Sequence, residues 1–202
     1  MSLEFLSVFI PMFVVIDPFG SLVLFSGLTH NLPEKNRRVI IRDATIYGFF
    51  ILLFFIIFGN IILDFFGISI EALEVAGGII LLLMGIQMVR GIEKPVSSSS
   101  SDPSEVQDFG IVPLATPMLA GPGAISLVII LSNGGFMTQV MTIISAIILF
   151  ALVYVFFSFS SRLMELIGSK TMKATTRVFG LLVAAFAIQY FINAMISLKL
   201  IK

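Results

Sequence analysis

Long apolar stretches are the feature of this chain that most constrains its fold. A helix of about 20 apolar residues is long enough to cross the roughly 30 Å hydrocarbon core of a bilayer. Only 12% of the residues are charged, against about a quarter in soluble domains. The sequence therefore predicts an all-α integral membrane protein with six transmembrane helices, at residues 4–28, 44–64, 73–91, 109–131, 138–160 and 178–198.

The first apolar stretch contains one ionisable residue, followed directly by a helix breaker. Asp17 is the only ionisable residue from 5 to 28, and Pro18 follows it. A charge and an opened backbone are both costly in hydrocarbon, so together they indicate a protein-lined cavity. The helix from Pro18 to Leu28 would measure about 16 Å, half of the core, which places the break near the midplane. Gly121-Pro122-Gly123 interrupts the fourth stretch in the same way.

The two halves of the chain repeat each other weakly. Gly78 and Gln87 in the third stretch match Gly180 and Gln189 in the sixth, and the members of each pair are nine positions apart. A repeat of three spans begins its second copy on the opposite side of the membrane, so the copies have inverted topology. We therefore expect three-helix repeats at 1–96 and 107–202, joined by a flexible serine-rich linker at 97–106, with helices one and four broken near the midplane.

Basic residues are distributed unevenly between the spans. Ten of the twelve lysines and arginines lie in the segments 29–43, 90–108 and 161–177, and the other two follow the last span. The positive-inside rule places these three segments in the cytoplasm. We expect a multi-pass protein of the cytoplasmic (inner) membrane with both termini outside.

Other chemistries have little support in the sequence. The chain has no cysteine and a single histidine, His30, so neither a metal site nor a cofactor is expected. The basic residues form no stripe that would bind nucleic acid. No motif pairs an activated nucleophile with a base, so an enzyme is not expected.

The residues around the two breaks form the candidate substrate site. Asp17 and Pro18 suit the N-cap and first position of a second half-helix, and Pro122 opens another after Gly121. Two helix N-termini that meet at mid-depth would bind a carboxylate, and Gly20 and Gly123 would allow close approach. Asp17 would meet an ammonium group, or exchange a proton or cation; the alternative is that it only caps its helix.

Other polar residues in the spans have two interpretations each. Ser21, Thr116 and Ser126 flank the breaks, where they would bind a carboxylate or satisfy freed carbonyl groups. Gln87 and Gln189 would line the cavity or form hydrogen bonds between helices, and the second of these is the more common role.

Six short motifs spread over essentially the whole chain resemble those of a known family, the MarC family of membrane proteins, which includes SnatA-type small neutral amino acid transporters. The resemblance implies a six-span carrier of two inverted repeats that moves glycine or alanine, with protons as a candidate coupling ion. The motifs are residues 17–29, 66–70, 75–79, 112–117, 120–123 and 177–182.

The residues and the resemblance together predict a secondary transporter of small neutral amino acids that works by alternating access. Its partners would be the amino acid, H⁺ or Na⁺, and membrane lipid; the oligomeric state is left open. An ion channel or exchanger that uses Asp17, and an antibiotic efflux protein, are the alternatives.

Overall fold

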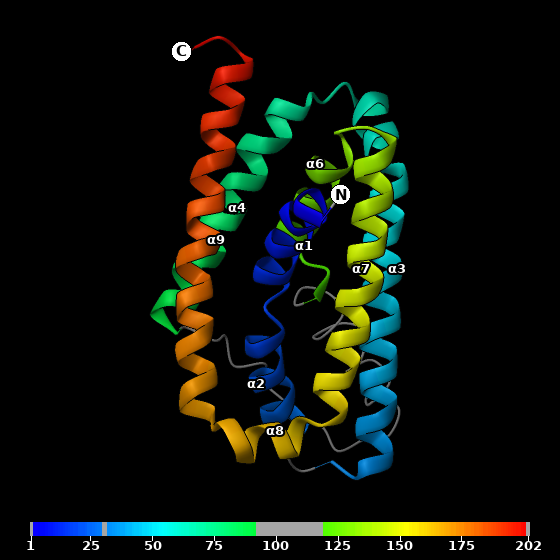
Figure 1. Ribbon diagram of the computed structural model, residues 1–202, viewed down its shortest axis with the longest axis vertical. Helices are drawn as coiled ribbons and strands as arrows, with labels where there is room; N and C mark the ends of the chain where they lie inside the picture. The colour runs from blue at the N-terminus through cyan, green and yellow to red at the C-terminus, as the bar shows by residue number, and fades with distance from the viewer. Residues whose placement is uncertain (1, 30–31, 92–118, 201–202) are drawn as a thin grey trace.

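The computed structural model describes residues 2–29, 32–91 and 119–200, and its secondary structure is helical, with no strand in these ranges (Figure 1). The predicted serine-rich linker, Thr116 and His30 lie outside the described residues. The helices are α1 (Ser2–Ile16), α2 (Pro18–Thr29), α3 (Glu34–Phe66), α4 (Ile70–Arg90), α6 (Pro122–Ser132), α7 (Phe136–Ser158), α8 (Ser160–Ile167) and α9 (Ser169–Ser197).

The predicted all-helical membrane fold is confirmed. Within the described ranges, five helices are long and apolar enough to cross a membrane, and the first of them, Glu4–Val23, runs through the break at Asp17. The fourth predicted span is represented by α6, which is its second half and is too short to cross alone. The complete arrangement of six helices in two inverted repeats stays a prediction.

The helices extend further than the predicted spans. α3 begins at Glu34 and α9 at Ser169, about ten residues before the predicted starts, so most of the basic residues predicted in loops are helical. The physical reason is that hydropathy reports where a chain crosses hydrocarbon, whereas a helix continues into the polar headgroup layer. The short helix α8, which connects α7 to α9, was not predicted because eight residues are too few for a span.

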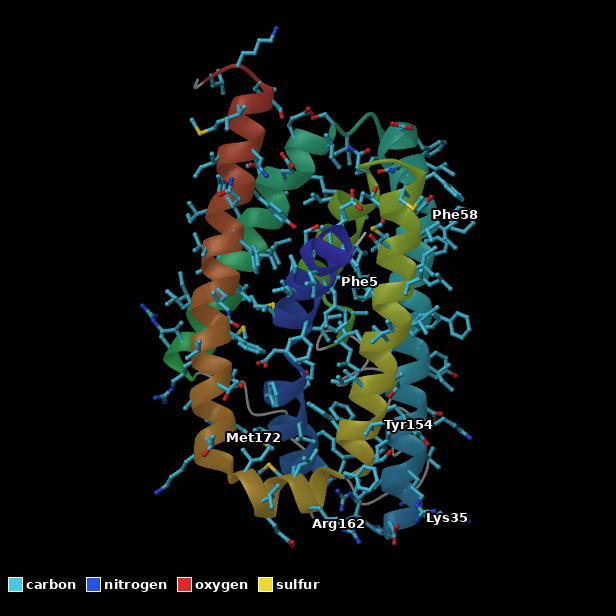
Figure 2. The ribbon with its side chains drawn as sticks, in the orientation of Figure 1. Phe5, Lys35, Phe58, Tyr154, Arg162 and Met172 are labelled. Atoms are coloured by element: carbon cyan, nitrogen blue, oxygen red, sulfur yellow. The ribbon has the colours of Figure 1, made fainter. Side chains whose placement is uncertain are left out.

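The long helices form antiparallel pairs around the interrupted ones. α3 runs beside α7 and α4 beside α9, while α1, α2 and α6 lie between these pairs (Figure 1). Lys35 and Arg162 lie at the end of the molecule that α8 closes, and the C-terminus lies at the opposite end (Figure 2). This separation agrees with the uneven charge distribution of the sequence, while the side that faces the cytoplasm stays a prediction.

Glycines bring α4 and α9 into close contact. A Cβ atom added to Gly85 would lie 2.6 Å from the carbonyl oxygen of Gly180, and one added to Gly78 would lie 3.0 Å from that of Ala187. Small residues of this kind allow membrane helices to pack closely. Gly78 and Gly180 are 102 positions apart, and so are Gly85 and Ala187, so each contact joins one member of the first pair to one member of the second. This reciprocity supports the predicted repeat.

Candidate functional site

The first break is centred on Asp17, where one helix ends and another begins. The amide of Asp17 donates to the carbonyl oxygen of Phe13 at 3.1 Å, and its own carbonyl oxygen accepts from the amide of Ser21 at 2.9 Å. Its φ of 42° is left-handed, a conformation that costs a non-glycine residue about 1–3 kcal/mol. Such strain is concentrated at functional sites, so the break is a candidate for one.

The side chain of Asp17 is the N-cap of α2, as predicted. Its Oδ1 accepts a hydrogen bond of 3.1 Å from the amide of Gly20, and the residue is only 5% exposed. Ser21 Oγ donates to the carbonyl oxygen of Ile16 at 3.1 Å, so it satisfies a carbonyl group that the break sets free. Pro18 and Gly20 are also buried. Polar groups opened by the break are thus paired within the protein, as hydrocarbon requires.

At the second break a helix also begins at a proline, but the residue before it has no charged side chain to cap the helix. Gly121 is extended, with φ −74° and ψ 170°, and Pro122 is the first residue of α6, as predicted. The amide of Ile125 donates to the carbonyl oxygen of Gly121 at 2.9 Å, which is the first bond of the helix. Gly123 and Ser126 are buried. The start of α6 therefore offers backbone N–H groups without a side-chain cap.

Each half-helix packs against the third span of the other half. A Cβ atom added to Gly20 would collide with Asp17 Oδ2 and lie 3.0 Å from Thr176 Oγ1 of α9. One added to Gly123 would lie 2.8 Å from Leu81 Cδ2 of α4. α1 also packs against α6, which brings the two interrupted regions together. Thr176 is a residue that the sequence analysis missed, because it was assigned to a loop.

Four phenylalanines form a cluster beside the first break. The ring of Phe19 lies 6.1 Å from that of Phe13, 5.9 Å from Phe179 and 5.5 Å from Phe156, measured between centroids. These rings come from α1, α2, α7 and α9. The cluster gives the break apolar surroundings, and the faces of aromatic rings attract cations. The sequence analysis did not single out these phenylalanines.

The two glutamines differ from the residues at the breaks. Gln87 and Gln189 are exposed, and Gln189 Nε2 donates to Asn193 Oδ1 of the same helix at 2.9 Å. This arrangement does not test whether the two glutamines line a cavity or form hydrogen bonds between helices. Their place in the site therefore stays a prediction.

Ser145 of α7 is a polar residue that the sequence analysis did not single out. It is 0% exposed, and its Oγ has no hydrogen-bond partner in the part of the chain that the structure describes. It precedes Phe156 by eleven residues, which is about three helical turns, so it lies on the face of α7 that contacts the interrupted first helix. A buried unpaired hydroxyl requires an explanation, and a role in ligand binding would supply one.

Replacing Ser145 by alanine is expected to leave the free energy of unfolding unchanged or raise it by up to about 1 kcal/mol, because no bond is lost. Thr142→Val is the matched control, since Thr142 Oγ1 donates to the carbonyl oxygen of Thr138 at 2.8 Å. Thermal unfolding in detergent would compare the two variants. A loss of stability in Ser145→Ala as large as that in the control would contradict the prediction.

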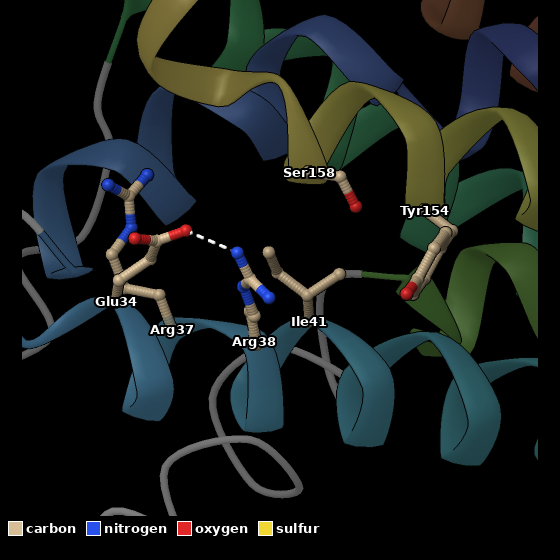
Figure 3. A pocket seen from close by; sticks show the side chains of 6 residues that line it. All are labelled: Glu34, Arg37, Arg38, Ile41, Tyr154 and Ser158. Carbon is tan, nitrogen blue, oxygen red and sulfur yellow. Dashed lines mark hydrogen bonds and ion pairs between the residues drawn. The ribbon is translucent and has the colours of Figure 1, made fainter.

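Two surface hollows lie near the two ends of the helices, away from the breaks. One, of about 340 Å³, lies between the start of α3 and the end of α7 (Figure 3). The other, of about 240 Å³, lies where α3, α4 and α6 end or begin, and Asn60, Asp64, Ser69 and Asn133 contribute its polar lining. At the breaks Asp17, Gly20 and Gly123 are buried, whereas Pro122 is exposed.

These features define a class: a multi-pass helical membrane protein whose first helix is interrupted at a buried carboxylate. The chain belongs to the MarC family of integral membrane proteins, whose family model matches residues 3–198. The resemblance seen in the sequence is thereby confirmed, while the SnatA-type subgroup stays a prediction.

Relatives resemble the chain over most of their length. A UPF0056 membrane protein of Methanocaldococcus jannaschii is 34% identical and covers 94% of both chains. The UPF0056 membrane protein YvbG of Bacillus subtilis is 37% identical over 90% of this chain and 89% of its own. No solved structure matches the chain.

Proposed function

We propose that this protein is a secondary transporter of small neutral amino acids of the glycine and alanine class. The observation that carries the proposal is the break at Asp17, a buried carboxylate between two half-helices inside a membrane span. Broken spans of this kind form the substrate sites of many secondary transporters. Membership of the MarC family supports a membrane role.

The two breaks would divide recognition of a zwitterion between them. The N–H groups at the start of α6, which have no side-chain cap among the described residues, suit its carboxylate. Asp17, with the rings of Phe13 and Phe19, suits its ammonium group. The close packing at Gly20 and Gly123 favours a substrate with a small side chain. Protons or Na⁺ would supply the coupling, and Asp17 is the residue that would exchange them.

Movement of the helices would open this closely packed centre to each side in turn. The protein would lie in the cytoplasmic membrane, with the end that carries Lys35 and Arg162 inside and both termini outside. An ion channel or exchanger that uses Asp17 is the second candidate, because the Asp17 carboxylate could bind a cation without any amino acid substrate.

Thermal unfolding of the purified protein with each of the twenty amino acids tests the proposal. Glycine, alanine or serine is expected to raise the melting temperature, because a ligand that binds only the folded state stabilises it, whereas bulky and dibasic amino acids should not. Repetition at several pH values, with and without Na⁺, would identify the coupling ion. If no amino acid shifts the melting temperature, and liposome flux neither saturates nor shows counterflow, the channel is favoured.

A further inference from the structure

The hollow at the basic end has no role in the proposed transport, yet it is built from charged and polar side chains. α3 contributes the residues on one side and α7 those on the other (Figure 3). Its volume of about 340 Å³ is in the range of small-ligand sites. The lining residues are Glu34, Arg37, Arg38, Ile41, Tyr154 and Ser158.

The hollow lies at the depth of the lipid headgroups. α3 has 33 residues and would measure about 50 Å, whereas the hydrocarbon core is only about 30 Å thick. The uncharged part of α3 begins at Ala44, so the residues from Glu34 to Ile41 precede the membrane core. The short helix α8 crosses the same end of the molecule (Figure 1).

One arginine of the hollow is held in a fixed orientation. Arg37 Nη2 donates to Ser160 Oγ at 2.6 Å, and its guanidinium carbon lies 5.7 Å from the centroid of the Phe25 ring. A guanidinium group carries five N–H donors in a rigid plane, so one that is fixed in place suits the oxygens of a phosphate group.

The other arginine can change its partner. Arg38 Nη2 lies 2.6 Å from Glu34 Oε1, but both side chains are 77% exposed. Exposed ion pairs of this kind contribute little, so a phosphate can replace the carboxylate at low cost. Among the described residues of the lining, two guanidinium groups and one carboxylate give a net charge of +1.

The outer surfaces of the same two helices are apolar above the hollow. Ile46 of α3 and Ile147 and Tyr154 of α7 are all exposed, and each lies within about a quarter turn of the lining residues of its own helix. We propose that this hollow binds the phosphate of an anionic membrane lipid, whose acyl chains lie along these exposed side chains. Basic hollows between membrane helices bind lipid headgroups in this way.

The test uses the full chain, purified in a neutral detergent, and its melting temperature. The added probes are dihexanoyl phosphatidylglycerol, dihexanoyl phosphatidylcholine and inorganic phosphate, each in a titration. Arg38→Gln removes one lining guanidinium, and its exposure makes misfolding improbable; the melting temperature without lipid checks this. Lys35→Gln is the matched control, since it removes an exposed positive charge from the same turn of α3 outside the lining.

Phosphatidylglycerol is expected to raise the melting temperature of the wild type and of Lys35→Gln equally. In Arg38→Gln the apparent affinity should fall about tenfold, the effect of one charge-assisted hydrogen bond. An equal response to phosphatidylcholine, or an equal loss in Lys35→Gln, would overturn the proposal. Full stabilisation by inorganic phosphate alone would assign the hollow to a free anion, and would also overturn it.

Discussion

Asp17→Asn is expected to raise the KM for glycine uptake about tenfold while leaving the fold intact. The asparagine oxygen can still accept from the Gly20 amide, and asparagine is as good an N-cap as aspartate. It also tolerates the left-handed φ of 42°. What the substitution removes is the charge, and a charged hydrogen bond to an ammonium group is about twice as strong as a neutral one.

Uptake into proteoliposomes over a range of pH would measure both the KM and any proton coupling. Asp64→Asn is the control, because it makes the same substitution at an exposed position at the end of α3. Asp17→Ala should lose the cap as well, at a further cost of about 1 kcal/mol in the free energy of unfolding. A KM and a pH dependence in Asp17→Asn equal to those of the wild type would show that the carboxylate only caps its helix.

Ala184→Leu is expected to lower the free energy of unfolding by about 1–3 kcal/mol, the usual cost of overpacking. The reason is the close contact of α4 and α9, in which the Cβ atom of Ala184 lies 3.1 Å from the position of a Cβ added to Gly85. The residue that faces Ala184 on α4 is Gly85, whose backbone a larger side chain cannot displace.

Ala185→Leu is the matched control, since the next residue along α9 is exposed and has room for the same added volume. Thermal unfolding of both variants in one detergent would separate packing from any general effect of a larger side chain. Equal melting temperatures for the two variants would mean that α4 and α9 do not form a close seam in solution.

The breaks could be predicted from the sequence because their causes are local. Asp17 and Pro18 carry the capping and φ preferences of a helix start, and Pro122 has the same preferences after Gly121. These capping and φ preferences are the same in water and in a membrane. The class of fold was equally accessible, because an apolar stretch of 20 residues has few alternatives in water or membrane.

What surrounds the breaks could not be predicted. Thr176 reaches Gly20, and Phe179 reaches Phe19, across more than 150 residues of chain, and no periodicity within one helix reports such contacts. Ser145 was missed for a related reason: a serine in a span is common, and only the structure reveals that its hydroxyl is buried.

The packing of α2 against α9 has a consequence for how the protein is made. α9 leaves the ribosome after every other described helix, so one side of the polypeptide just beyond Asp17 has no protein neighbour until synthesis has passed Ser197. A nascent chain that stalls before Ser169 would hold an aspartate in the bilayer without its final cover.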